Sequence, residues 1–274
     1  MHCPTKSRAG GLTPSGDIDS DSHLPIVGAY STACDEQGRL YVATPGILIA
    51  FERTSSNSFR QAQSGSLKLA TATRFLFVGL DSIYIVGHNG DASTPIHLAA
   101  PDGSVTRSFG GVPTSQSSGS APAYATGGAL LQHVKTGRIV YVPFWPYEFR
   151  VYGREGTLIS VHSRKDADFQ LDRRHPETGR PLGNDVVLGA VSLPTGEIIT
   201  EVLKRKPASV TTYKEERYFE IFDSDFNLHT TGVSAAKLGY LKGASGDGAV
   251  YFADISRPRG VTVVRARLTA LPQP

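Results

Sequence analysis

Gly137-Arg-Ile-Val-Tyr-Val142 opens the most regular stretch of this sequence, which continues to His162. A turn glycine precedes a run of β-branched and aromatic residues. A second such run ends in the polar turn Arg154-Glu-Gly156, and one more short run follows. Runs of this composition between glycine turns are typical of antiparallel strands joined as hairpins. The stretch therefore predicts consecutive strands of one antiparallel sheet.

The same pattern recurs along the chain. The first turn and its strand are repeated at Gly38–Val42, Asp81–Ile85, Gly196–Thr200 and Asp247–Phe252. The second run is repeated at Ile47–Arg53, Ile96–Gly103, Tyr218–Phe226 and, cut short, Val261–Leu268. An apolar stretch precedes each first turn, at residues 26–33, 69–78, 129–134, 186–193 and 238–245. With the short strand after each second turn, the pattern predicts units of four strands, which is the composition of a propeller blade.

In its turns and strands the unit resembles the NHL-like repeat of six-bladed β-propellers, over about residues 26–268. The resemblance implies an all-β fold of four-stranded blades and favours the six-bladed type. About five units are visible and the last lacks its outer strand. Either the segment Asp17–Leu24 closes a five-bladed ring, or the chain is a piece of a six-bladed one and Met1 is not the natural start. A flat or sandwich-like all-β arrangement is the alternative.

Composition agrees with one large all-β domain. The 274 residues include 29 glycines and 17 prolines, with 39% hydrophobic and 19% charged residues, so turn formers are frequent and a packed core is possible. We expect a flexible N-terminal segment (1–25), which can contribute a closing strand, the propeller (26–268) and a C-terminal tail (269–274).

Charge gives no sign of a nucleic-acid or membrane partner. The net charge is only +3, and the most basic region, residues 162–217, balances ten Lys and Arg residues with nine Asp and Glu residues. Cys3 and Cys34 provide no disulfide framework. The first 25 residues lack the apolar core of a signal peptide, and no apolar run is long enough to span a bilayer. We expect a soluble monomer. The sequence does not indicate its cellular compartment, which is extracytoplasmic if the N-terminus is truncated.

The connections between strands indicate where a ligand would bind. Both kinds of tight turn fall on one face of a blade, because consecutive strands are antiparallel. The other face receives the second-to-third connections and the crossings between blades, which are long and varied. They are 87–94, 110–122, 163–185, 204–217 and 255–260. Function on a rigid scaffold is usually carried by such loops, so this face is the expected binding face.

Three groups of residues on that face are candidates. The first is Phe144-Trp-Pro-Tyr147, which contains the single tryptophan, and its rigid aromatic rings suit a ligand platform. The structural alternative is that Phe144, Trp145 and Tyr147 cover the core, as buried aromatic residues commonly do. His88-Asn-Gly-Asp91 places an imidazole, the Asn89 amide and a carboxylate on one loop, although Asn-Gly is also an ordinary turn pair. Arg257, in the connection 255–260, is the third.

Calcium loops are not expected. Asp17-Ile-Asp-Ser-Asp21 has the carboxylate spacing that opens such a loop, but its sixth position is Ser22 instead of glycine and its twelfth is Gly28 instead of glutamate. Asp223-Ser-Asp-Phe-Asn227 fails in the same way, and the repeat explains it as a turn within a blade. We therefore expect no bound metal and no cofactor.

Two functions follow from this pattern. The favoured hypothesis is a non-catalytic scaffold that binds a protein or a small molecule on the long-connection face. The alternative is a metal-dependent hydrolase or lyase of the kind found among gluconolactonases and streptogramin lyases, propellers that the fold resembles. Such enzymes place single acidic, amide or imidazole side chains at strand ends, and His88, Asn89, Asp91 and Asp254 are then the candidates, with a divalent metal as cofactor.

Overall fold

The structure is a computed structural model. It describes residues 8–9, 24–25, 31–35, 39–44, 46–54, 59–67, 75–79, 82–87, 94–111, 127–164, 169, 173–174, 176–179, 181–183, 185–209, 212–234, 238–254 and 262–267. All regular structure in these residues is β, in strands numbered β1 to β23. Over this part of the chain, the structure has no helix long and apolar enough to cross a membrane.

The strands form the antiparallel sheets that the repeat predicts, and we refer to these sheets as blades 1 to 5. Blade 1 contains β3 (Ser31–Cys34), β4 (Leu40–Thr44), β5 (Ile47–Arg53) and β6 (Phe59–Ser66). Blade 2 contains β7 (Phe75–Gly79), β8 (Ser82–Val86), β9 (Ile96–Ala99) and β10 (Val105–Phe109). Blade 3 contains β11 (Gly128–Gln132), β12 (Ile139–Pro143), β13 (Glu148–Tyr152) and β14 (Leu158–Ser163).

The fourth and fifth sheets follow the same order. Blade 4 contains β17 (Val186–Ser192), β18 (Ile198–Pro207), β19 (Tyr213–Phe222) and β20 (Leu228–Ser234). Blade 5 contains β21 (Tyr240–Ala244), β22 (Ala249–Asp254) and β23 (Thr262–Arg267), so among the described residues it lacks an outer strand, as expected. Two short pairs stand apart from the blades, β1 (Arg8–Ala9) with β2 (Leu24–Pro25) and β15 (Arg173–Arg174) with β16 (Pro181–Gly183). The rest of the proposed closing segment, Asp17–His23, lies outside the described residues.

The chain divides into two compact units, residues 1–116 and 117–274. The first unit holds blades 1 and 2, and its core contains the buried side chains of Tyr41, Leu48 and Ile85. The second unit holds blades 3 to 5. Within it the first strands of successive blades are neighbours, β11 beside β17 and β17 beside β21. Four-stranded antiparallel sheets packed through their first strands are the architecture of a β-propeller.

Glycines stand where the tight turns need them. Gly137, Gly156 and Gly196 have φ values of 64°, 90° and 105°, a conformation that costs other residues free energy. These turns join the first strand to the second or the third to the fourth, as the repeat predicts. In blade 4 the corresponding residue of the third-to-fourth turn is Phe226, with φ 65°.

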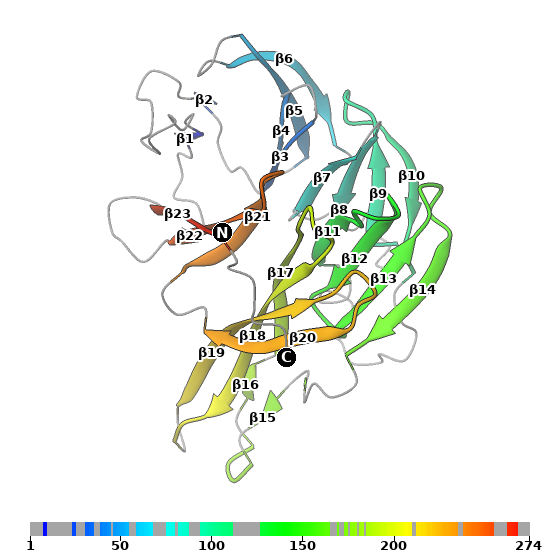
Figure 1. Ribbon diagram of the computed structural model, residues 1–274. Coiled ribbons are helices and arrows are strands. Elements are labelled where there is room, and N and C mark those ends of the chain that lie inside the picture. Colours follow the sequence, from blue (N-terminus) through cyan, green and yellow to red (C-terminus); the bar gives the residue numbers. More distant parts are fainter. Residues whose placement is uncertain are drawn as a thin grey trace. The chain divides into compact units, whose positions relative to one another are not determined.

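One predicted connection is a pair of strands. Residues 204–217 were expected to form a long loop, but β18 and β19 pair continuously from Ile198↔Phe222 to Pro207↔Tyr213. The pairing supplies the backbone hydrogen bonds that a loop would leave to water. The last residue of β18 that pairs with β17 is Leu203, and the first residue of β19 that pairs with β20 is Tyr218. The rest of β18 and β19 therefore extends beyond the sheet as a two-stranded hairpin (Figure 1).

Candidate functional site

In the second unit, the long-connection face of blades 3 and 4 carries a group of charged and buried polar side chains. At this edge of a blade, the first and third strands begin and the second and fourth end, because the strands are antiparallel. Blade 3 contributes the connection Phe144–Tyr147 and the end of β14. Blade 4 contributes Asp185, the hairpin of β18 and β19 and the end of β20.

The Phe144–Tyr147 connection is attached to its surroundings through the backbone. The Phe144 carbonyl accepts a hydrogen bond from the Val187 amide of β17, at 3.0 Å, and the Tyr147 carbonyl accepts one from Arg164 N at the end of β14, also at 3.0 Å. The Trp145–Pro146 peptide bond is cis. Phe144 and Trp145 are partly buried, whereas only 4% of Tyr147 is exposed and its ring packs in the core shared by blades 3 and 4.

Tyr147 reaches a buried carboxylate of blade 4. Its hydroxyl donates to Glu220 Oε2 at 2.7 Å and lies 2.6 Å from Thr200 Oγ1. Thr231 donates to the other oxygen, Glu220 Oε1, at 2.8 Å, and Arg164 Nε forms an ion pair with Oε2 at 3.5 Å. Burial is the main cause of the raised pKa of Tyr147, and the charge of Glu220 adds to it. Glu220 is thus surrounded by donors and fixes the positions of its partners.

A groove lies over the same side of β18, β19 and β20, and we call it the β18–β20 groove. Its volume is about 480 Å³, which is within the roughly 300–1,000 Å³ of typical ligand pockets. The residues that line it are charged or carry a hydroxyl group, apart from one glycine, and they are Lys204, Lys206, Lys214, Glu215, Glu216, Arg217, Tyr218, Thr231, Gly232 and Ser234. Side chains alternate along a strand, so Lys204, Lys206, Lys214 and Tyr218 share the side of Thr200 and Glu220.

Tyr218 connects the groove to the buried Glu220 network. Its ring is partly buried, and burial, followed by the negative charges of Glu220 and Asp185, raises the pKa of its hydroxyl. The phenol therefore stays protonated at neutral pH and can donate a hydrogen bond to a ligand. The groove thus combines cationic side chains at its outer end with hydroxyl groups nearer the sheet.

On the opposite side of blade 4, a second buried carboxylate joins blade 4 to blade 5. Glu201, 1% exposed, accepts a hydrogen bond from the Leu241 amide at 2.8 Å and forms a 2.8 Å ion pair with Arg217. The Arg217 guanidinium also lies 4.0 Å from the centre of the Tyr240 ring. Burial raises the pKa of Glu201 and lowers that of Lys242. These contacts hold β21 against β18 and β19.

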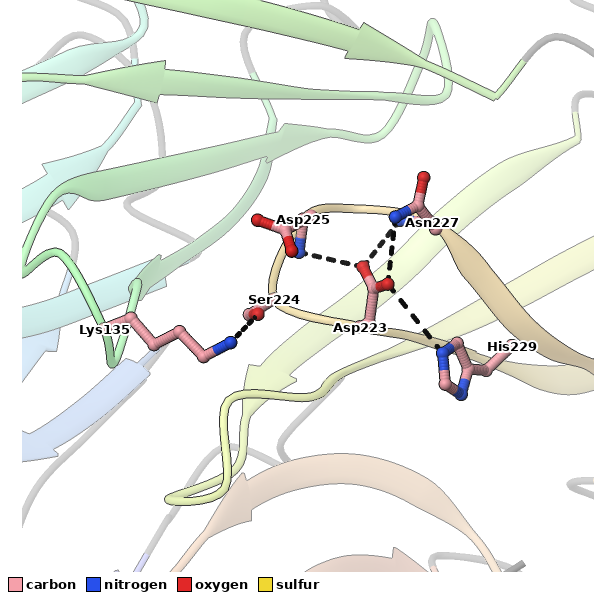
Figure 2. Close-up of polar contacts among 6 residues, drawn as sticks. All are labelled: Lys135, Asp223, Ser224, Asp225, Asn227 and His229. Carbon is pink, nitrogen blue, oxygen red and sulfur yellow. Dashed lines mark hydrogen bonds and ion pairs between the residues drawn. The ribbon is translucent and has the colours of Figure 1, made fainter. Parts of the chain in front are cut away.

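The tight-turn face of the second unit contains a different cluster, shown in Figure 2. Asp223 Oδ1 accepts hydrogen bonds from the amides of Asp225 and Asn227, both at 2.8 Å, and Oδ2 accepts one from Asn227 Nδ2 at 2.9 Å. Burial would raise the pKa of Asp223, but these hydrogen bonds outweigh it and hold the pKa below its usual value. Lys135, from blade 3, donates to the Ser224 hydroxyl (Figure 2).

This turn is a structural motif of the blade. The Asp223 carboxylate accepts hydrogen bonds from amide groups, and such an arrangement favours a capped turn over a cation site. Among the residues that the structure describes, no group of three or more His, Cys, Asp or Glu side chains is placed to hold a metal ion.

The candidate binding residues that the sequence predicts do not form one cluster among the residues that the structure describes. Phe144 and Trp145 lie on the expected face, and Tyr147 beside them is a core residue. His88, Asn89, Asp91 and Arg257 lie outside the described residues, and Asp254 is the last residue of β22. The sequence reasoning missed Glu201 and Glu220. The available signal was a glutamate inside an apolar strand, as in Tyr218-Phe-Glu-Ile221.

No family model matches this sequence, and no curated protein matches it. Solved structures do resemble the chain. A virginiamycin B lyase from Staphylococcus aureus is 11% identical with a TM-score of 0.53, and the match covers 96% of this chain and 74% of the lyase. A protein of unknown function from Bacteroides caccae is 13% identical with a TM-score of 0.53, over 95% of this chain and 89% of that one. Likeness at such low identity concerns the fold, and together with the blades it shows that the chain has a β-propeller fold.

Proposed function

We propose that this protein is a non-catalytic binding propeller whose ligand lies in the β18–β20 groove. The observation that carries the proposal is a concave surface of ligand size, lined by charged and hydroxyl-bearing residues, on the face where the long connections lie. Such surfaces on rigid β scaffolds are common binding sites. Its lysines lie on the hairpin of β18 and β19, whose pairing continues to Pro207↔Tyr213, and its other wall is β20, which pairs with β19.

The buried network beneath the groove supports binding more than catalysis. A general acid or base must be within hydrogen-bonding reach of its substrate. Glu220 already accepts from Tyr147 and Thr231 and pairs with Arg164, and Glu201 already accepts from Leu241 and pairs with Arg217. Both carboxylates therefore act as structural supports: Glu220 positions Thr231 at the groove, and Glu201 holds Arg217 on the opposite side of the sheet.

We also propose that the repeat belongs to the six-bladed, NHL-like type. The support is the order of turns and strands in blade 3, where a positive-φ glycine precedes each of two strands, at Gly137 and Gly156. An experimental structure of the natural protein, in which the blades are counted, tests this assignment directly.

The binding proposal is tested by mapping ligands on the isotopically labelled protein. A panel of small neutral, anionic and cationic compounds is added singly, and amide chemical shifts are recorded. We expect shifts to concentrate at Thr231, Gly232 and Ser234, and the compounds to be recovered unchanged. Ser234→Trp, which fills the groove, should abolish them, whereas Thr157→Trp, on the tight-turn face, should leave them in place.

Two results would contradict the proposal. If no compound in the panel shifts the groove amides, or if the shifts concentrate on the tight turns, the groove is not the binding site. If a bound compound is chemically converted, the protein is an enzyme and the non-catalytic part of the proposal is wrong. Circular dichroism of each variant must match the wild type, so that loss of binding is not loss of folding.

A further inference from the structure

The β18–β20 groove has an excess of positive charge. Lys204, Lys206 and Lys214 point to the same side of the hairpin, and only one carboxylate, Glu216, shares that side with them in the lining. Glu216 forms ion pairs with Lys206 at 2.7 Å and with Lys214 at 3.7 Å. Three ammonium groups and one carboxylate give this side a net charge of +2 among the described residues of the lining.

The other charged groups of the lining do not change this excess. Glu215 is paired with Arg205 on the opposite side of the hairpin, at 2.8 Å. Arg217 is paired with Glu201 and donates to the Gly239 carbonyl. Each of these charges already has a partner of opposite sign, so the lysines dominate the potential inside the groove.

The arrangement of the lysines is unfavourable without a ligand. Lys206 and Lys214 are directly opposite each other in the pairing of β18 and β19, and like charges in that position destabilise a sheet. The bridges that Glu216 makes are exposed, with 55% of Lys206 and 70% of Lys214 accessible, and exposed ion pairs contribute little. An anion between the lysines would relieve the repulsion at small cost in existing contacts.

Neutral donors complete the site. Tyr218 and Ser234 contribute hydroxyl groups to the lining, and the Thr231 hydroxyl, whose proton is donated to Glu220 Oε1, can only accept. Gly232 has φ 77°, and a Cβ there would meet nothing within 4 Å, so the backbone beside it is open to a ligand. Backbone and hydroxyl donors beside lysines are the usual surroundings of a phosphate or sulfate group.

We propose that the groove binds a small molecule bearing a phosphate or sulfate group, held by Lys204, Lys206 and Lys214. The choice between anions follows from the donors. Lysine binds phosphate as a compact point charge, and a net charge of +2 on this side matches a dianionic phosphate or sulfate better than a singly charged carboxylate. The only arginine of the lining, Arg217, is engaged by Glu201. The inference rests on the proposed function, of which it specifies the ligand.

Inorganic phosphate and inorganic sulfate are the probes, and their affinities are measured by calorimetry and amide shifts at low ionic strength. Lys204→Gln and Lys214→Gln should each weaken binding about tenfold, the loss of one charge-assisted hydrogen bond. Arg138→Gln removes the same charge from the tight-turn face and should change the affinity less than twofold. Glu216→Gln removes the competing carboxylate and should tighten binding severalfold, a result that general loss of structure cannot produce.

A pH series separates the two anions. Phosphate esters lose their second proton near pH 6, so the affinity for a phosphate monoester such as glycerol phosphate should fall between about pH 7.5 and pH 5. The affinity for sulfate should stay constant over that range, because sulfate remains a dianion.

The anion proposal fails if the wild type binds neither probe, or if Lys204→Gln and Arg138→Gln weaken binding equally. Should neutral or cationic compounds of the panel shift the groove amides while phosphate and sulfate do not, the ligand class is wrong and the binding groove stands. When no compound of any charge shifts those amides, the proposed function itself has failed.

Discussion

At the residue scale, Phe226 occupies a turn position that blades 2 and 3 give to glycine, Gly103 and Gly156. Its φ of 65° is in the left-handed region, which is costly for a side chain with a Cβ. The aromatic ring offsets this cost through its contacts with blade 3. Its centre lies 4.4 Å from that of His162, 5.1 Å from that of Phe149 and 5.6 Å from that of His133. The packing of its ring between blades 3 and 4 thus stabilises a backbone conformation that is unfavourable by itself.

Substitution at Phe226 separates these two contributions. Phe226→Gly loses the ring but relaxes the backbone, whereas Phe226→Ala loses the ring and keeps the backbone strain. We expect both variants to be less stable than the wild type, by about 2–4 kcal/mol. Alanine should be the worse of the two by about 1 kcal/mol, because it is disfavoured at positive φ. Urea unfolding measures the difference, and alanine being the more stable would show that this φ is not maintained.

The sequence predicts few individual site residues, and the reason is physical. Trp145 was noticed because it is a rare residue in a short connection, but the significance of Glu220 depends on Tyr147, which is 73 positions away and belongs to another blade. A contact of this kind is set by how blades pack, and no local pattern encodes it. Lys204, Lys206 and Lys214 belong to a region whose net charge is close to zero in the sequence. Their concentration on one side of the hairpin becomes visible only when β18 and β19 are paired, because side chains then alternate between the two sides.

At the element scale, strands and turns could be predicted well. The turn glycines and the alternation of β-rich runs locate β5 at Ile47–Arg53, as expected from sequence. The first strands of blades 1 and 2 are located less closely, because the apolar stretches 26–33 and 69–78 begin about five residues before β3 and β7. The exception is the hairpin of β18 and β19. Its charged residues are typical of a loop, but Arg205↔Glu215 and Lys204↔Glu216 face each other across the pair and stabilise an extended structure.

Blades 1 and 2 contact each other closely at Gly65 of β6. A Cβ on Gly65 would lie 1.4 Å from the carbonyl oxygen of Asp102, in the third-to-fourth turn of blade 2. Because the obstructing atom belongs to the backbone, no side-chain rotation can make room. Gly65→Ala should therefore force the strand and the turn apart and lower the free energy of unfolding by about 1–3 kcal/mol.

The matched control for this element is Gly111→Ala. A Cβ at Gly111 would meet nothing within 4 Å, so the change should be within about 0.5 kcal/mol of neutral. Thermal or urea unfolding of the two variants side by side checks the prediction. Equal effects would mean that β6 and the turn of blade 2 do not approach each other as described.

At the scale of the whole molecule, the fold class follows from repetition of one small pattern. Each four-stranded blade follows from an apolar stretch, a first turn with its β-rich run, a second run and a polar turn with a short last strand, and consistent local signals of this kind favour one topology. The number of blades and the ligand are not set by that pattern. Blade number depends on closure between distant strands, and ligand choice depends on side chains that the repeat leaves variable.

Helix content is the global property that tests the fold. The described chain consists of strands β1 to β23 without a helix, and its sequence has no sustained apolar period of 3.6 residues. Far-ultraviolet circular dichroism of the purified protein should therefore show a β-sheet spectrum with very little helical signal. An average globular protein has roughly a third of its residues in helices, so the expected spectrum is distinctive. A measured helix content above about a fifth of the residues would be incompatible with five successive antiparallel blades, because a propeller is built almost entirely of strands and turns.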